Sequence, residues 1–251
     1  ELARGLEGYP FDEMTQVYKY RADVGSNWKL FIDAFAEFYH APILHAKQAV
    51  SDESRKLQTY GYEALAYKLD GPHGMVSSWG GMSPPKDINM VKPIEQKLRS
   101  GLFGPWEDYL DAEMPPALNP SRSPVWGMDS FHFFPNFMLL TYWPNWTITY
   151  NYWPTSYNTH IFEGTLHFVP PRNAFERMQQ ELAAVTFKEY ALQDGNTLEA
   201  TQTMLESRVI SEFPLNDQEI LLRHLHRTAG RYVAEHQHRQ PGTPVRVSAV
   251  S

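Results

Sequence analysis

The sequence predicts an α+β fold, in which an antiparallel sheet packs against a long helix and further helices. The first observation is that residues 130–169 are rich in Phe, Tyr, Trp, Thr and Ile, the residue types that favour strands. The second is that turn residues divide this region, at Pro135-Asn136, Pro144-Asn145 and Pro154-Thr155-Ser156. The third is the helical spacing of apolar residues after Arg172.

The first half of the chain mixes short strands and helices. Val17 to Val24 alternates partly between apolar and polar residues and predicts a strand. The apolar spacing from Asn27 to His40 predicts a helix packed into the core, and His45 to Tyr67 is polar and permits a helix. A short strand, a short helix and a loop rich in Pro and Gly are then predicted at His73 to Trp79, Pro93 to Ser100 and Gly101 to Pro124.

The second half contains the predicted sheet and its helices. The predicted strands are Ser130 to Phe134, Phe137 to Trp143, Trp146 to Tyr152 and Thr159 to Val169. The predicted helices are Arg172 to Tyr190, Asn196 to Ser207 and Asn216 to Glu235, the last capped by Asn216. In the first helix the spacing predicts a buried face of Phe175, Met178, Leu182 and Val185. The polar tail from His236 is expected to fray.

Composition excludes several classes of protein. The 251 residues are enough to bury a sizeable core, and a net charge of −7 provides no basic surface for nucleic acid. The sequence has no membrane-spanning apolar run and no signal-like start, so we expect a cytoplasmic protein. It also has no phosphate-binding loop and no Gly-x-Ser-x-Gly sequence.

The stretch from Asn27 to His45 carries the strongest functional signal. Its groups that can bind a metal or move a proton are Asp33, Glu37, His40 and His45. Such groups are costly in an apolar helix unless something pairs with them, and a divalent cation is one possible partner. Pro42 disfavours helix before it, so the helix should end near His40 and the chain should turn, which lets the two imidazoles converge. The alternative is that both histidines are simply solvated or hydrogen-bonded.

This pattern resembles the mononuclear iron site of the Rieske non-haem iron oxygenases, the alpha (large) subunits of aromatic-ring-hydroxylating dioxygenases and related monooxygenases. The matching positions are Asn27, Trp28, Lys29, Asp33, Glu37, Tyr39, His40 and His45. The resemblance implies that His40 and His45 bind iron and that Glu37 relays electrons or protons from a neighbouring subunit's Rieske cluster. It also implies a catalytic contribution of Asp33, although many members carry Glu-Asn-Phe where this chain has Asp33-Ala34-Phe35.

The third ligand in this family is a carboxylate far downstream, followed by Glu five residues later and Gln eight residues later. Asp194, Glu199 and Gln202 stand at that spacing. The resemblance therefore implies Asp194 as the third metal ligand. Taken alone, Asp194 before Gly195 is more typical of a turn that caps the following helix.

The resemblance also implies a fold and a chemistry. The fold is the helix-grip fold (Bet v 1-like or START-like), an antiparallel sheet around a long C-terminal helix with a pocket between them. The chemistry uses mononuclear Fe(II) and O2 to hydroxylate a small apolar or aromatic substrate, by mono- or dioxygenation. Electrons would come from a ferredoxin or reductase through a Rieske [2Fe-2S] cluster, which this chain cannot bind because it has no cysteine. Family members assemble as homotrimers or as α3β3 complexes.

We therefore expect residues 1–24 to be a connector and first strand after a missing Rieske domain, residues 25–235 the catalytic iron domain, and residues 236–251 a polar tail. Two other functions stay open, namely a helix-grip domain that binds a hydrophobic ligand without catalysis, and a zinc-dependent hydrolase. The pairs His224/His226 and His236/His238 are predicted to lie on the surface, because residues two apart on a helix point about 200° apart.

Overall fold

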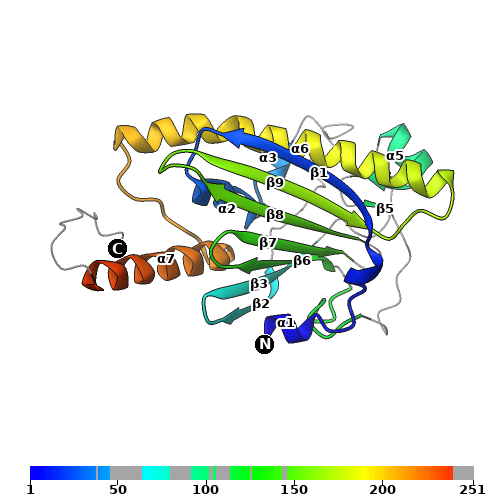
Figure 1. Cartoon of the computed structure of the whole chain (residues 1–251), viewed down its shortest axis with the longest axis horizontal. Coiled ribbons are helices and arrows are strands. Elements are labelled where there is room, and N and C mark those ends of the chain that lie inside the picture. The colour runs from blue at the N-terminus through cyan, green and yellow to red at the C-terminus, as the bar shows by residue number, and fades with distance from the viewer. Residues whose placement is uncertain are drawn as a thin grey trace.

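The computed structural model describes residues 1–37, 39–45, 64–79, 92–101, 104–105, 114–124, 126–142 and 146–239. Its centre is a seven-stranded sheet in the order β1-β9-β8-β7-β6-β3-β2, with antiparallel neighbours throughout (Figure 1). The strands are β1 (Gln16–Val24), β2 (Ala64–Asp70), β3 (His73–Trp79), β6 (Trp126–Phe133), β7 (Phe137–Tyr142), β8 (Trp146–Pro154) and β9 (His160–Phe168). The predicted α+β class and the predicted meander are confirmed.

Helices precede, interrupt and follow this sheet. They are α1 (Leu2–Gly5), η1 (Phe11–Glu13), α2 (Trp28–Phe35), α3 (Ala41–Leu44), α5 (Pro93–Leu98), α6 (Ala174–Ser207), η5 (Asp217–Glu219) and α7 (Ile220–Arg239). Two very short strands, β4 (Ser100–Gly101) and β5 (Gly104–Pro105), pair with each other. Within the described ranges, no helix combines the length and the apolar character that crossing a membrane requires.

The long helix α6 differs from the sequence prediction, because it runs unbroken where two helices were expected. Asp194 and Gly195 lie inside this 34-residue helix instead of forming a turn. Asn173 caps its start by accepting a hydrogen bond from the backbone N–H of Glu176, and Arg208 ends it in the left-handed region at φ 55°. The tertiary contacts of its buried residues outweigh the helix cost of one internal glycine, roughly 1 kcal/mol.

The buried face of α6 was also predicted wrongly. Phe175, Met178 and Val185 are 47%, 52% and 60% exposed. The buried positions are instead mostly small or polar, namely Gln179, Gln180, Ala183, Ala184, Thr186 and Phe187. At one close approach the small residue belongs to the sheet, and the ring of Phe187 packs against it. A Cβ built on Gly164 of β9 would lie only 2.8 Å from Cζ of Phe187.

Strand β2 was not predicted, because its residues were assigned to a polar, helix-permissive stretch. Residues 46–63 of that stretch lie outside the described residues, but Ala64–Asp70 is extended and pairs with β3. The turn between the two strands has Gly71 at φ 59°, a conformation that favours glycine in a tight hairpin. The hairpin turn and the neighbouring strand therefore decide the conformation of β2, whose own burial pattern is weak.

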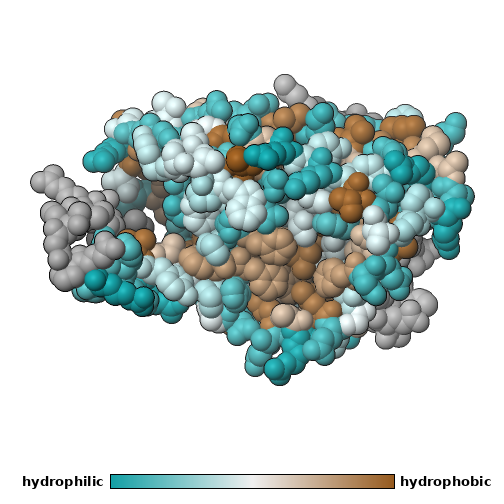
Figure 2. All heavy atoms as spheres, in the orientation of Figure 1, coloured by the Kyte–Doolittle hydropathy of each residue, from teal (hydrophilic) through white to brown (hydrophobic). Residues whose placement is uncertain are grey.

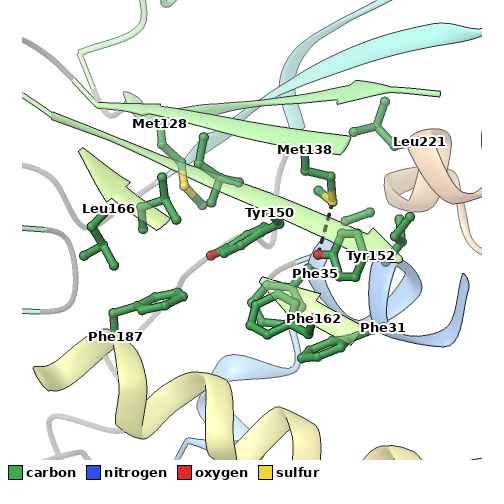
Figure 3. Close-up of a cluster of buried hydrophobic side chains, with 14 of the residues drawn as sticks. Phe31, Phe35, Met128, Met138, Tyr150, Tyr152, Phe162, Leu166, Phe187 and Leu221 are labelled. Carbon is green, nitrogen blue, oxygen red and sulfur yellow. Dashed lines mark hydrogen bonds between the residues drawn. The ribbon is translucent and has the colours of Figure 1, made fainter. Parts of the chain in front are cut away.

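Helices α2, α6 and α7 cover one face of the sheet and enclose its larger apolar core. Figure 3 shows aromatic rings from α2 and α6 meeting rings from β8 and β9. Phe31 of α2 lies 4.4 Å from Phe162 of β9 between ring centroids, and Phe35 lies 4.8 Å from Tyr150 of β8. At the other end of the sheet, Leu221 of α7 packs against Gly74 of β3.

The opposite face of the sheet carries a second, smaller apolar cluster. Leu2 and Leu6 near α1, with Leu118, cover part of it, while Phe131 of β6 and Leu139 of β7 lie beneath. Figure 2 shows this face, with apolar side chains gathered over the middle strands. The candidate metal-binding residues lie on the other side, where α2, α3 and α6 meet.

Candidate metal centre

The segment that follows α2 carries both histidines. Asn27 caps α2 by accepting a hydrogen bond from the backbone N–H of Lys29, and buried Phe31 and Phe35 anchor the helix on the sheet. The helix ends at Phe35, earlier than the predicted end near His40. The carbonyl of His40 then accepts the first hydrogen bonds of the single-turn helix α3.

Helix α3 explains how the two histidines converge. His40 stands directly before Ala41–Leu44 and His45 directly after it, so one helical turn separates them. Proline is tolerated in the first turn of a helix, where its missing N–H has no intrahelical partner to lose. Pro42 therefore starts a new turn after the chain has changed direction. The ring centroids of His40 and His45 lie 5.3 Å apart, which agrees with the prediction that the chain turns after His40 and lets the two imidazoles converge.

Helix α6 brings Asp194 to the same place. Two other side chains of α6 fix its position against the start of α2. Oε1 of Glu199 accepts a hydrogen bond from the backbone N–H of Gly25 at 3.3 Å, and Oε1 of Gln202 accepts one from the N–H of Asn27 at 2.9 Å. Glu199 and Gln202, singled out by their spacing from Asp194, are therefore not at the centre itself, and they join the two ligand-bearing segments.

The three side chains form a compact group. One ligand atom from each of His40, His45 and Asp194 lies within 4.8 Å of the others. Oδ1 of Asp194 is 3.4 Å from Nε2 of His45 and 3.6 Å from Nε2 of His40. The opposite ring nitrogens are held separately. Nδ1 of His40 lies 2.7 Å from Oε1 of Glu37, and Nδ1 of His45 lies 2.6 Å from Oε1 of Gln193. Both Nε2 atoms consequently face a common point.

A cation fits this arrangement. Asp194 is 3% exposed and His45 5% exposed, and Oδ1 of Asp194 is buried without a hydrogen-bond partner among the described residues. Leaving a carboxylate oxygen buried and unpaired is expensive, whereas a metal bound at that oxygen would satisfy it. Two imidazole nitrogens and one carboxylate are the donor set of non-haem Fe(II) sites, and zinc sites use a similar set.

The charges around His40 support a cation as well. Burial lowers the pKa of its imidazole, but the hydrogen bond and negative charge of Glu37, together with the charge of Asp194, outweigh burial and raise the pKa overall. Positive charge at this position is therefore stabilised by two carboxylates.

Asp33 lies elsewhere in the structure. Both of its carboxylate oxygens are 3.0 Å from Nε2 of His226 on α7. His226 lies at the surface as predicted, with its side chain 40% exposed, and it also bridges two helices. Nε2 of His224 contacts the carbonyl of Gly71 at 3.0 Å. The structure thus gives Asp33 a partner on α7, and its catalytic role stays a prediction.

Sequence reasoning missed two partners of the segment that carries both histidines, Gln193 and Glu219. Gln193 holds His45, but an apparent turn at Asp194-Gly195 concealed its place on a continuous helix. Tyr39 donates a hydrogen bond to Oε1 of buried Glu219 at 2.8 Å, which ties the segment before His40 to the start of α7. Only the tertiary fold brings these partners together, because they are separated by 148 and 180 residues.

The interior next to the centre is aromatic. Burial raises the pKa of Tyr150 and Tyr152, and the negative charge of Asp194 raises both further. Phe187 and Leu198, on the same helix as Asp194, belong to the aromatic core of Figure 3, where Tyr150, Tyr152 and Phe162 line the sheet. The candidate centre therefore lies between a polar segment and a buried interior rich in aromatic rings.

The fold and the converging side chains define a helix-grip domain with a candidate metal centre. The chain belongs to the family of ring-hydroxylating alpha subunits, whose catalytic-domain model matches residues 11–235. The resemblance seen in the sequence is thereby confirmed.

Solved structures share this fold. The quaternary ammonium Rieske monooxygenase CntA, in complex with inhibitor MMV12, matches with a TM-score of 0.58 and 12% sequence identity, over 92% of this chain and 52% of that chain. Dicamba monooxygenase bound to dicamba matches with a TM-score of 0.55 and 12% identity, over 87% of this chain and 60% of that chain. The chain thus spans roughly half to three-fifths of the length of these proteins. No curated protein matches the sequence.

Proposed function

We propose that this chain is the catalytic domain of a Rieske-type ring-hydroxylating oxygenase and that His40, His45 and Asp194 hold a mononuclear Fe(II). The observation that carries the proposal is that two imidazole Nε2 atoms converge on a buried carboxylate oxygen that has no hydrogen-bond partner within the part of the chain that the structure describes. Two histidines and one carboxylate leave other positions around iron open, and bound iron would supply the activation of O2 there.

Glu37 would orient one metal ligand and relay electrons or protons to the centre. Glu37 holds Nδ1 of His40, which leaves Nε2 directed at the metal. The Glu37 side chain is 10% exposed and contacts the ring edge opposite Nε2, and we assign it the relay of electrons or protons from a Rieske cluster on another subunit. A ferredoxin or reductase donor and a homotrimeric or α3β3 assembly belong to this proposal. One similar structure is described as revealing inter-subunit electron transfer.

The proposed substrate is a small apolar or aromatic molecule. Rings from α2, β8, β9 and α6 form a buried apolar cluster on the side of the sheet that carries Asp194, and an apolar or aromatic molecule suits such surroundings. Dicamba and L-carnitine are bound in similar structures, so a quaternary ammonium is the other class worth testing. Aromatic faces bind such cations by cation–π attraction.

The test is iron content after anaerobic loading with Fe(II), compared between wild type, Asp194→Ala and Asp217→Ala. Asp217 is a matched control because its carboxylate is fully exposed at the start of η5. We expect about one iron per chain in wild type and in Asp217→Ala, and loss of iron in Asp194→Ala.

Other outcomes would contradict the proposal in distinct ways. No iron in any of the three folded proteins would favour a helix-grip domain that binds a hydrophobic ligand. Zinc retained in competition with Fe(II), together with hydrolytic activity, would favour a metal-dependent hydrolase. Thermal denaturation with and without metal gives a second readout, because a ligand that binds only the folded state raises the melting temperature.

A further inference from the structure

Helix α6 holds the His45 ring from several sides. Asp194 approaches Nε2 at 3.4 Å, and Gln193 contacts Nδ1 at 2.6 Å. Tyr190 packs on the ring, with a centroid separation of 4.5 Å. These three residues are spaced so that they share one side of the helix. A single rigid helix therefore provides the proposed ligand and two contacts that orient the neighbouring ligand.

The contact with Gln193 determines which ring nitrogen carries the proton. Oε1 of Gln193 is a carbonyl oxygen and accepts a hydrogen bond, so Nδ1 of His45 must donate. A neutral imidazole protonated on Nδ1 has its lone pair on Nε2. That lone pair faces Asp194, which is the direction needed to bind a metal.

The two histidines are held by chemically different acceptors. Nδ1 of His40 lies against the carboxylate of Glu37, whereas Nδ1 of His45 lies against the amide of Gln193. Glu37 and Asp194 contribute two negative charges around the centre, which balance the two positive charges of a divalent cation. A third carboxylate would add one negative charge beyond these two to a buried site.

We propose that Gln193 is a positioning residue that fixes His45 in the Nδ1-protonated form and, because it is neutral, matches the centre to a divalent rather than a trivalent cation. The proposal rests on the proposed binding of metal by His40, His45 and Asp194. Gln193 is not one of these three ligands, and the proposal explains why an amide side chain stands at this position.

The first test needs no metal. Nitrogen-15 NMR of histidine-labelled, metal-free protein reports which nitrogen of His45 carries the proton. We expect wild type to show the Nδ1-protonated form, Gln193→Leu to show a mixture of the two forms, and Gln193→Glu to keep the wild-type form. Leu192→Ala is the matched control, because Leu192 is adjacent on α6 and 52% exposed. An unchanged His45 signal in Gln193→Leu would overturn the positioning role.

The second test compares two redox-inert probes, Co(II) and Ga(III), by titration. Loss of a group that orients a metal ligand weakens metal binding by about 10- to 100-fold, and we expect this loss of Co(II) affinity in Gln193→Leu. In Gln193→Glu the hydrogen bond persists but the charge changes, so the ratio of Ga(III) to Co(II) affinity should rise at least tenfold. The Glu variant has nearly the same shape as wild type and keeps the test decisive if the Leu variant does not fold.

The outcomes separate this inference from the proposed function. If Asp194→Ala loses Co(II) but both Gln193 variants bind both probes as wild type does, the role of Gln193 is overturned and the metal centre stands. If wild type itself binds neither probe, the metal centre is overturned and the charge-matching role falls with it.

Discussion

The carboxylate of Glu37 and the carboxylate of Asp194 flank the same imidazole from opposite edges. Oε1 of Glu37 is 2.7 Å from Nδ1 of His40, and Oδ1 of Asp194 is 3.6 Å from Nε2. The ring thus separates a carboxylate placed to bind a metal from one placed outside the metal's reach. The two carboxylates should respond differently to substitution.

Replacing Glu37 with Gln should leave iron in place and abolish coupled turnover. The amide oxygen still accepts the hydrogen bond from Nδ1 of His40, so the ring keeps its orientation. The negative charge next to the ring is lost, and with it the proposed path for electrons or protons. The measurement is iron content together with product formed per O2 consumed, in an assembly that contains the Rieske cluster. Wild-type coupling in the variant would refute the relay role.

The pair of His226 and Asp33 should make stability depend on pH near neutrality. The hydrogen bond and charge of Asp33 raise the pKa of His226 above its ordinary value, against the effects of burial and of Lys29. The folded state therefore binds this proton more tightly. Its stabilisation is fully present below about pH 6.5 and is lost as pH rises through the raised pKa.

The measurement is the urea midpoint of wild type and of His226→Gln between about pH 5.5 and 8.5. The difference between the two proteins should be largest at the acid end and shrink as pH rises. Because the His226 side chain is 40% exposed, solvent screening keeps the effect small. A constant difference across the range would show that proton binding at His226 does not contribute.

Buried Asp129 should make the protein less stable as pH rises, whereas a carboxyl group with a lowered pKa makes a protein more stable as pH rises. Burial raises its pKa to about 6, although hydrogen bonds from Ser77, Asn119 and Trp126 act to lower it. Between about pH 4 and pH 6 the folded state holds a proton that the unfolded chain has released, so stability falls as pH rises. A shift of about two pKa units corresponds to roughly 3 kcal/mol.

Asp129→Asn removes this titration. We expect the variant to be less stable at pH 4, because an amide can accept fewer of the donated hydrogen bonds, but to show a flatter profile up to pH 6. Denaturation by urea at several pH values measures both quantities. A slope equal to that of wild type would place the titrating group elsewhere.

Replacing two glycines with alanine should change the free energy of unfolding in opposite directions. Gly195 lies inside α6, and an added Cβ would meet no described atom within 4 Å. Gly195→Ala should therefore raise the free energy of unfolding by about 0.5–1 kcal/mol, because alanine favours the helix. Gly164→Ala should lower it by about 1–3 kcal/mol, because its Cβ would lie 2.8 Å from Phe187. Chemical denaturation of both variants measures these changes, and equal signs would refute the argument.

The strands and turns of the sheet could be predicted because their signals are local. β3 spans the predicted residues, and β6 to β9 follow the predicted meander, since aromatic and β-branched runs stand between clear turn residues. Asn216 was likewise predicted as a cap, and it accepts hydrogen bonds from Gln218 and Glu219 at the start of η5.

The sequence predictions were wrong where a tertiary contact determines which of two locally possible conformations the chain adopts. Asp194 and Gly195 suggest a turn by themselves, but Leu198 and Gln202 dock the helix beyond them and keep it continuous. The apolar spacing of α6 suggested the wrong face, because its buried face combines Phe187 with small and polar residues such as Ala183 and Gln179. The candidate metal ligands were predicted from spacing and resemblance, and the structure brings the three side chains together. Gln193 could not be predicted, because its partner is 148 residues away.

The location of Asp194 links metal affinity to the completeness of folding. Two of the proposed ligands lie within one short segment, while the third arrives only when α6 has docked through Glu199 and Gln202. A partly folded chain would therefore offer two imidazoles without the carboxylate. Metal binding would select the fully assembled domain and, at a hundredfold excess over the dissociation constant, stabilise it by about 2.7 kcal/mol. Tight metal binding would therefore report that the domain has folded completely, before any reaction takes place at the centre.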